Sequence, residues 1–386
     1  MDFSQEILDS LKINRKELHK IPEVGFKEFK TQQYIIKILS SLGFSPKSIC
    51  DTGVSLFIDN KKESTIAFRA DIDALPILEE NDIEFKSTHE GYMHACGHDG
   101  HSAILLGFAH YLSQTDLSHL NYNILLIFQP AEETPGGAKD IAASGILEQC
   151  KVKSIFGLHI SPKLEEGYIG SRAGGFMAKA SEINVDIFGK SGHCGQPQSS
   201  IDSIQAAIKF LEQINCVVAK NLSPFDPSLI SFNKIQGGTI RNIVAEHTRI
   251  EGTIRSFSKE SFEFIKNKIF SIKTGLEIGF DVKIDVDINS GYPPVVNDNE
   301  LYKILQNSVN SSSNLKFIEL EPEMLAEDFS FYLEKIPGVF FFLGSKNVDK
   351  GYIHPLHNSK FNFDEKVLEY GIEAYVMLLE TLNNKY

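Results

Sequence analysis

The stretch Thr65-Ile66-Ala67-Phe68-Arg69-Ala70-Asp71-Ile72-Asp73 decides the fold class, because a short apolar run is followed at once by two carboxylates. Similar β-branched and aromatic runs occur at residues 123–128 and 154–158, and helix-like segments such as residues 102–112 lie between them. Strands that alternate with helices predict an α/β layer with a largely parallel sheet.

Residues 180–288 show a different order of predicted elements, namely strand, helix, strand, strand, helix and strand. The predicted strands and helices lie at residues 182–188, 201–220, 229–235, 247–255, 259–278 and 281–288. This β-α-β-β-α-β order is the ferredoxin-like split motif. The chain is therefore predicted to form a discontinuous α/β catalytic domain, residues 1–178 and 292–386, with an inserted lid or dimerisation domain, residues 179–291.

Each predicted helix of the inserted domain has an apolar face that can cover a sheet. The first face consists of Ile201, Ile204, Ile208 and Leu211. The second consists of Phe262, Ile265, Ile269 and Ile272. We expect both faces to pack on the strands of the insertion.

The bulk composition excludes several classes of protein. With 386 residues, 42% of them apolar and 23% charged, the chain is large enough for two folded domains. Its net charge of −13 argues against binding to nucleic acid or to anionic membranes. The sequence shows neither a signal peptide nor an apolar run of bilayer length, and its five widely spaced cysteines indicate free thiols. We expect a cytoplasmic protein.

Metal-capable side chains follow three of the predicted strands at the point where each strand ends. Asp71 and Asp73 follow the first strand, Glu132 and Glu133 follow the second, and His159 follows the third. Open α/β sheets form their ligand sites at the carboxyl ends of the strands. These side chains are therefore expected to meet at one rim of the sheet.

The loop His94-Ala95-Cys96-Gly97-His98-Asp99-Gly100-His101 concentrates three histidines, a thiol and a carboxylate before a predicted helix. Thiolate and neutral imidazole are preferred ligands of zinc and similar metals, so Cys96 and His98 can face one ion. The alternative is a crowded helix N-terminus, in which Asp99 or Ser102 caps free amides and Cys96 is merely buried.

Further candidate residues are two adjacent carboxylates and a histidine near the C-terminus. Glu132 and Glu133 follow Pro130, so their side chains should diverge, and one can bind metal while the other acts as a base. Taken alone, two adjacent carboxylates are more often a solvated surface pair. The segment 353–358 adds one more candidate imidazole, His357.

Two glycine-rich segments of the inserted domain present polar side chains. Residues 189–195 present His193, and residues 237–242 present Arg241 and Asn242. The glycines could serve tight turns alone. Because the first domain contains a metal-capable cluster, we interpret these two segments as parts of a lid over the site.

Five ordered motifs resemble the metal-site motifs of the aminoacylase and carboxypeptidase-type metallohydrolases. They lie at residues 69–76, 94–101, 129–133, 157–159 and 356–358. Within that group the chain is most similar to the branch that holds hippurate hydrolase, indole-acetyl amino acid hydrolases and N-acetyldiaminopimelate deacetylase. Because the motifs cover nearly the whole chain, the resemblance is specific for the family.

The resemblance implies a site with two divalent ions and a general acid/base, Glu132. The implied metal ligands are Cys96, His98, Glu133, His159 and His357. A thiolate ligand favours zinc, while the other ligands admit manganese, cobalt or nickel. The resemblance also implies a homodimer or larger homo-oligomer formed through the inserted domain, with His193 reaching into a neighbouring subunit's site.

The predicted reaction is hydrolysis of the amide bond of N-acyl-L-amino acids. Water activated by the ions gives a proton to Glu132, and His193 and Asn242 hold the developing oxyanion. Arg255 is the candidate for binding the substrate carboxylate, with Arg241 as the alternative.

Three other functional interpretations are also compatible with the sequence. They are a dipeptidase or carboxypeptidase of the same mechanism, a cysteine hydrolase with Cys96 as nucleophile, and an acyl-amino-acid-binding protein without turnover. The chain also departs from the family where Pro197-Gln198 replaces Pro-His and where Asn242-Ile243-Val244-Ala245 replaces Asn-Val-Ile-Pro. Both departures lie in the inserted domain and concern substrate contacts.

Overall fold

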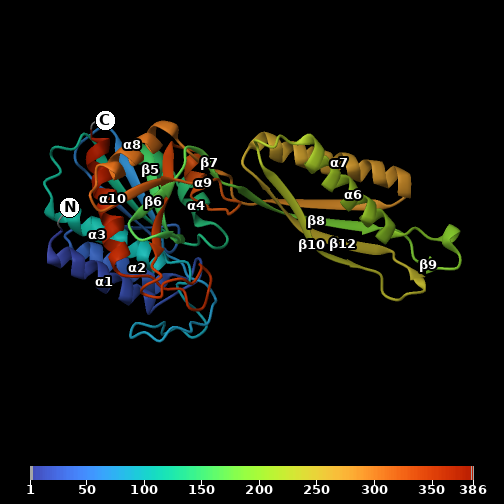
Figure 1. Ribbon diagram of the computed structural model, residues 1–386, viewed down its shortest axis with the longest axis horizontal. Coiled ribbons are helices and arrows are strands. Elements are labelled where there is room, and N and C mark those ends of the chain that lie inside the picture. Colours follow the sequence, from blue (N-terminus) through green and yellow to red (C-terminus); the bar gives the residue numbers. More distant parts are fainter. Residues whose placement is uncertain (1–2, 384, 386) are drawn as a thin grey trace. The chain divides into compact units, whose positions relative to one another are not determined.

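The computed structural model describes residues 3–383 and 385 of the chain (Figure 1). Its contacts divide the chain into two compact units. The first unit comprises Met1–Gly174, Val296–Glu321 and Asp328–Tyr386, and the second comprises Gly175–Val295 and Pro322–Glu327. The predicted insertion, residues 179–291, lies inside the second unit, which also takes in the short segment 322–327.

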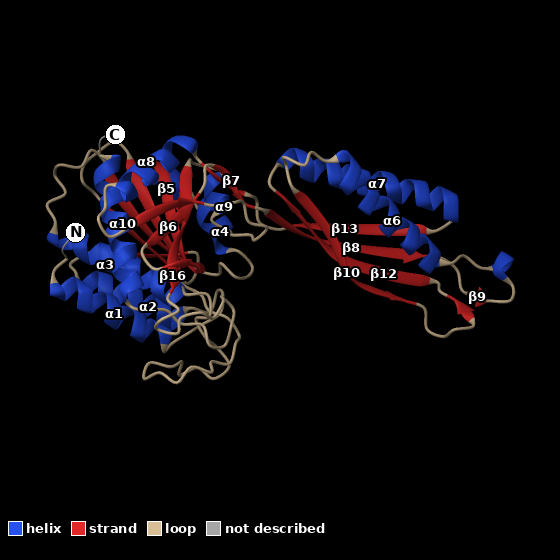
Figure 2. Ribbon diagram, viewed as in Figure 1, coloured by secondary structure: helices blue, strands red, loops and turns tan. Residues whose placement is uncertain are grey.

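The first unit contains an eight-stranded sheet in the order β1-β2-β4-β3-β5-β16-β6-β15 (Figure 2). The strands are β1 (Lys47–Ile49), β2 (Gly53–Ile58), β3 (Thr65–Asp71), β4 (Asn123–Gln129), β5 (Val152–Glu165), β6 (Tyr168–Ser171), β15 (Lys316–Glu319) and β16 (Gly338–Lys346). The central strands β4, β3, β5 and β16 run parallel, as do β6 and β15, whereas the β1–β2, β2–β4 and β16–β6 pairs are antiparallel. The predicted α/β fold with a mostly parallel sheet is confirmed.

Helices cover both faces of this sheet, and Figure 2 shows α4 and α9 across the strands from α3 and α10. The helices are α1 (Gln5–His19), α2 (Phe29–Ser41), α3 (His98–Gln114), α4 (Gly137–Ala143), α5 (Ile146–Gln149), α8 (Asn299–Asn310), α9 (Ser330–Leu333) and α10 (Lys366–Leu382). Helix α3 packs so closely that a Cβ on Gly107 would meet Leu11 of α1 at 2.3 Å. Within the described residues, no helix has the length and apolar character needed to cross a membrane.

Two element ends near the candidate site differ from the sequence prediction. Strand β5 continues to Glu165, because its pairing with β16 extends that far, so His159 lies within the strand and not after it. Helix α3 begins at His98, four residues before its predicted start. Gly97 precedes it in the left-handed region, with φ of 86°, which glycine adopts without steric cost.

The second unit is a four-stranded antiparallel sheet, β10-β12-β8-β13, with α6 and α7 on one face (Figure 1). Its elements are β8 (Lys179–Phe188), α6 (Ser203–Asn221), β10 (Ser228–Gly237), β12 (His247–Ser256), α7 (Lys259–Phe280) and β13 (Lys283–Ser290). The predicted β-α-β-β-α-β order is observed. Shorter strands are β9 (Gly192–His193) paired with β11 (Ile243–Val244), and β7 (Gly174–Met177) paired with β14 (Val295–Asn297).

The apolar face predicted for the first helix of the insertion is confirmed only in part, because Ile201 and Leu211 pack on the core but Ile208 does not. The face predicted for the second helix is confirmed. Ile208 is 40% exposed, and α6 instead buries Ala206, Ala207, Phe210 and Ile214. The hydroxyl of Ser203 donates to the carbonyl of Ala245 at 2.9 Å, which turns this face inward at the start of the helix. On α7, the predicted residues Phe262, Ile265, Ile269 and Ile272 are all buried.

The two faces of α6 give different expectations for stability. Phe210→Ala removes a fully buried ring and should lower the free energy of unfolding by about 3–5 kcal/mol. Ile208→Ala, on the exposed side, should cost less than about 1 kcal/mol. Urea unfolding followed by circular dichroism measures both, and equal losses would contradict the observed burial of Phe210 and exposure of Ile208.

A buried ionic cluster fixes α1 to α3. The ring of His19 lies 2.8 Å from Asp99 through Nδ1 and 3.1 Å from Glu79 through Nε2, and Arg15 lies 3.4 Å from Asp99. Burial lowers the pKa of His19, but the two carboxylates outweigh this effect and raise the pKa to about 8. His19 is therefore an imidazolium at neutral pH.

His19 should make stability depend on pH above neutrality. Because folding raises its pKa from 6.5 to about 8, its contribution is fully present below pH 6.5 and is lost as the pH rises through 8. The stability advantage of wild type over His19→Gln should be about 2 kcal/mol greater near pH 6 than near pH 9. Urea unfolding at both pH values checks this, and an advantage that grows with pH would contradict it.

Candidate metal centre

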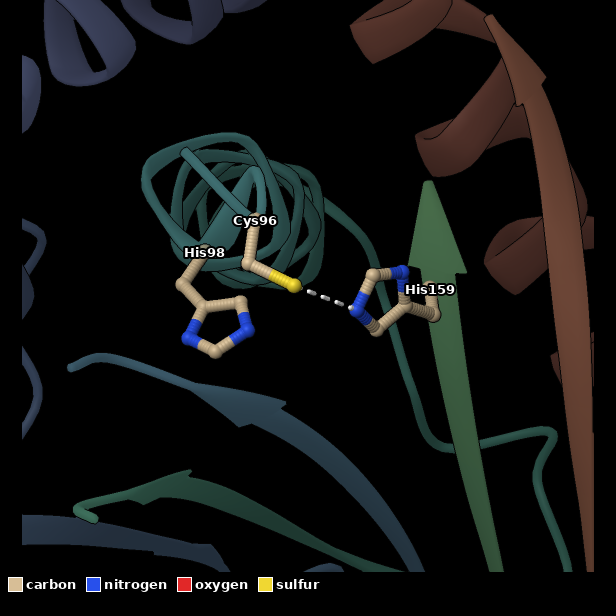
Figure 3. Close-up of side chains that lie close together, drawn as sticks. All are labelled: Cys96, His98 and His159. Carbon is tan, nitrogen blue, oxygen red and sulfur yellow. Dashed lines mark hydrogen bonds between the residues drawn. The ribbon is translucent and has the colours of Figure 1, made fainter. Parts of the chain in front are cut away.

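The candidate centre forms where β3, β5 and α3 of the first unit approach one another. Cys96 and His98 stand at the start of α3, and His159 comes from β5 (Figure 3). The Sγ atom of Cys96 lies 3.4 Å from Nε2 of His159, and all three side chains are buried. Residues far apart in the sequence therefore present sulfur and nitrogen atoms to one small volume.

This cluster overlaps two further groups of ligand atoms, and in each of the three groups the atoms lie within 4.8 Å of one another. The groups are Cys96, His98 and His159; Cys96, Glu133 and His357; and His98, Glu132 and Glu133. Together they contain all five side chains predicted as metal ligands and the predicted acid/base. The structure brings these six residues together, and their roles toward a metal remain predictions.

Both buried imidazoles are oriented for ligation through Nε2. His98 donates from Nδ1 to the carbonyl of Asp73 at 2.9 Å, and His159 donates from Nδ1 to the carbonyl of Ile160 at 2.7 Å. Nε2 of His98 is buried and has no hydrogen-bond partner among residues 3–383 and 385. A metal-ligating histidine usually anchors its second nitrogen in this way. A thiol, two such imidazoles and a carboxylate therefore fit a divalent ion.

The charges of the cluster also suit a cation. Burial lowers the pKa of His98, but Asp71 and Asp73 outweigh this effect and raise the pKa to about 10. Burial raises the pKa of the Cys96 thiol, and the nearby Glu133 raises it further. Without a metal, the imidazolium of His98 balances charge on the surrounding carboxylates, and the Cys96 thiol is neutral. A bound divalent ion would supply positive charge in place of these two protons.

Glu132 and Glu133 leave a sharp turn at the end of β4. Ala131 before them has a φ of 55°, which is left-handed. The amide of Glu133 donates to Asp73 Oδ2 at 3.0 Å, and its carboxylate lies 3.1 Å from Nε2 of His357. Glu132 is only 6% exposed. The alternative of a solvated surface pair is therefore wrong, because the turn directs both carboxylates inward.

The alternative of a capped helix N-terminus is also wrong. Gly97 is the N-cap residue of α3, and no side chain in the described part of the chain caps it. Asp99 binds His19 instead, and the hydroxyl of Ser102 donates to the carbonyl of Asp71 at 3.0 Å. Asp99 and Ser102 are thus bonded to α1 and to the end of β3, and neither caps the helix.

The sequence prediction missed the buried network that holds the strand ends. Arg69 donates to Asp71 at 2.7 Å, to Gln129 at 2.7 Å and to Asp328 at 2.9 Å, and these side chains are fully buried. Asp71 in turn accepts from His101 Nδ1 at 2.6 Å. The cationic arginine within the apolar run of β3 was the one available signal, because a buried charge requires a partner.

His101 is a supporting residue in this network. Its Nδ1 donates to Asp71, and its Nε2 accepts the amide of Ile160 at 2.8 Å. Burial lowers its pKa, so the ring is neutral. Both ring nitrogens are thus engaged in linking β3 to β5.

The predicted substrate contacts lie in the second unit. His193 on β9 lies beside Asn242, whose carbonyl accepts the amide of Cys194 at 3.1 Å. Gly195 donates its amide to Nδ1 of His193 at 3.1 Å, so the neutral ring carries its proton on Nε2. Arg255 lies near the other end of β12, eight residues beyond His247, or about 27 Å away along the strand. The structure thus gathers His193 and Asn242 but not Arg255.

Comparison with known proteins assigns the family. The model of peptidase family M20/M25/M40 matches residues 67–381. The chain belongs to this M20 family. M20 enzymes are metal-dependent amidohydrolases and peptidases with a dinuclear centre, so the chain is a metal-dependent amidohydrolase.

Individual relatives of this M20 enzyme match along nearly their whole length. It is 40% identical over 368 residues to N-acetyldiaminopimelate deacetylase of Shouchella clausii, covering 95% of the chain and 96% of the relative. The enzyme of the same name from Oceanobacillus iheyensis is 38% identical over 368 residues, covering 95% and 97%. The crystal structure of the Bacillus subtilis YXEP protein, described as a dinuclear metal-binding M20 peptidase, is 29% identical, with a TM-score of 0.87 and coverage of 99% and 100%.

Two histidines of the C-terminal loop offer a matched test of the ligand set of this M20 enzyme. His357 contacts Glu133, whereas His354 belongs to none of the ligand groups found among the described residues. We expect His357→Ala to lose about half of the bound metal, and His354→Ala to keep it, because of these two histidines His357 alone belongs to a group of potential ligand atoms among the described residues. Inductively coupled plasma mass spectrometry of the purified variants measures this. Equal metal content in both would remove His357 from the centre.

Proposed function

We propose that this M20 enzyme removes the acyl group from N-acyl-L-amino acids and that an N-acetyl amino acid is its substrate. The observation that carries the proposal is the buried carboxylate of Glu132 within 4.8 Å of ligand atoms of His98 and Glu133. Relatives named N-acetyldiaminopimelate deacetylase, 38–40% identical over most of the chain, support an acetylated diamino acid as the first substrate to test.

The proposed ligands supply the chemistry that an amide requires. Cys96, His98, Glu133, His159 and His357 would hold two divalent ions, which supply a water nucleophile of lowered pKa and polarise an acyl carbonyl. Thiolate and imidazole favour zinc, and the carboxylate and imidazoles also suit manganese, cobalt or nickel. Because the ligand set includes a reduced thiol, we place the enzyme in the cytoplasm.

Glu132 is the proposed carrier of the proton. Its carboxylate stands beside the ligand atoms of His98 and Glu133 but is assigned no metal of its own. It takes a proton from the attacking water and delivers the proton to the nitrogen of the departing amino acid. A carboxylate at this position can therefore act first as base and then as acid.

The second unit would hold the other parts of the substrate. His193 presents Nε2–H as a donor for the developing oxyanion, because the amide of Gly195 occupies Nδ1. Arg255 would bind the substrate carboxylate. His193 pairs with Ile243, which precedes β12, whereas Arg255 lies near the far end of β12, and this strand is longer than an acyl amino acid. This separation supports a homodimer in which the two contacts of one site come from different subunits.

Two alternative functions, a cysteine hydrolase and a dipeptidase, would use the centre in different ways. A cysteine hydrolase requires a reactive thiolate, whereas burial and the neighbouring Glu133 hold the pKa of the Cys96 thiol well above its usual range. A dipeptidase would use the same centre, and the YXEP relative is described as a peptidase. Dipeptides are therefore included beside N-acetyl-, N-benzoyl- and indole-acetyl-amino acids in the assay.

Glu132→Gln tests the proposed function. The variant should keep its metal content but lose roughly a hundred- to ten-thousandfold in kcat, because the amide cannot accept the proton. Amino-acid release from the substrate panel measures the rate, and elemental analysis confirms the metal. Full activity of the variant would contradict the role of Glu132, and tight binding of an N-acyl amino acid without release by wild type would favour a binding protein.

A further inference from the structure

The segment before α2 contains two glutamates, Glu23 and Glu28, whose side chains form different contacts. Glu23 caps the helix, because its Oε2 accepts the amides of Lys30 at 2.9 Å and Thr31 at 3.0 Å. Glu28 stands at the N-cap position of α2, yet its side chain makes no capping bond in the described structure. The fully buried carboxylate of Glu28 is instead directed away from its own helix.

The carboxylate of Glu28 reaches the turn that follows β4. Its Oε1 accepts the amide of Ala131 at 2.8 Å, and its Oε2 accepts the hydroxyl of Thr52 at 2.6 Å. The segment also approaches the turn directly, since a Cβ on Gly25 would meet the carbonyl oxygen of Thr134 at 2.3 Å. Glu28 is thus a fixed acceptor, held on one side by Thr52, for one particular amide.

Ala131 needs such an acceptor because its backbone is unusual. Its φ of 55° is left-handed, a region that residues with a Cβ adopt uncommonly. The carbonyl of Ala131 accepts the amides of Gly136 at 2.9 Å and Gly137 at 3.0 Å, so the peptide groups on both sides of its Cα are held. Glu132 is the next residue, and its direction depends on this conformation.

We propose that Glu28 is a positioning residue that aims Glu132 at the metal centre by fixing the left-handed backbone of Ala131. This inference rests on the proposed function of Glu132. Glu133 has an anchor of its own, because its amide donates to Asp73 and its carboxylate contacts His357. Loss of the Glu28 contact therefore loosens the backbone that carries Glu132, while these contacts hold the proposed ligand Glu133 in place.

Three substitutions separate the reach of the Glu28 side chain from its carboxyl group. Glu28→Asp keeps the carboxyl group but withdraws the acceptor, and it should lower kcat roughly ten- to a hundredfold, as expected for a misplaced catalytic group. Glu28→Gln keeps the reach, since its amide oxygen can accept from Ala131 and its nitrogen can donate to Thr52, and kcat should stay within about threefold of wild type. Glu28→Ala should resemble Asp. In all three, KM and metal content should stay close to wild type.

Glu23→Ala is the matched control. It removes three hydrogen bonds from the same segment, so it should lower the melting temperature. Within the described part of the chain, the Glu23 side chain bonds to Lys30 and Thr31 and not to the turn, so kcat should be unchanged. If Glu23→Ala lost as much activity as Glu28→Asp at equal loss of stability, Glu28 would be a structural residue only. Should Glu28→Ala fail to fold, the comparison of Asp with Gln decides the matter, and activity retained by Asp but lost by Gln would overturn the proposal.

A double-mutant cycle separates this inference from the proposed function. If Glu28 acts through Glu132, adding Glu28→Asp to Glu132→Gln should leave the residual rate of Glu132→Gln unchanged. A further tenfold or greater fall would overturn the role of Glu28 alone. Full activity of Glu132→Gln by itself would overturn the role of Glu132, and the two failures are thereby distinct.

Discussion

The buried ion pair between Arg69 and Asp71 is the constraint on which the rest of the centre depends. Both side chains are fully buried, and neither charge could remain there without partners. Arg69 therefore also binds Gln129 at the end of β4 and Asp328, and Asp71 also binds His101. Because Gln129 ends β4, His101 lies in α3 and Asp328 lies just before α9, satisfying the two charges fixes the ends of adjacent strands and the first turn of α3. Removing one partner from such a pair typically costs about 3–5 kcal/mol.

The proposed catalytic parts stand on this fixed frame. Asp73, two residues beyond the ion pair, orients His98 through its carbonyl and holds the amide of Glu133 through its carboxylate. The turn that carries Glu132 is held from the other side by Glu28. The reacting groups are thus set by hydrogen bonds from buried residues, so their geometry exists before any substrate arrives.

Much of this arrangement could be predicted from the sequence, and the exceptions have physical causes. Apolar runs followed by carboxylates located the strand ends, and the clustering of Cys96 with His98 located the centre. The partnership of Arg69 with Asp328 joins residues 259 positions apart, and no local pattern records such a pairing. The face of α6 was predicted only in part, because small residues and Phe210 pack inward, while the branched Ile208 stays outside.

The most direct test of the account is release of diaminopimelate from N-acetyldiaminopimelate by the purified enzyme before chelation, after chelation and after metal is restored. The account predicts release that stops when the metals are removed and returns with zinc or manganese, because bound ions would supply the water nucleophile. Release that continues undiminished in the metal-free protein would contradict the metal-dependent mechanism. Absence of release from this and every other N-acyl amino acid, with metal bound, would contradict the proposed substrate class.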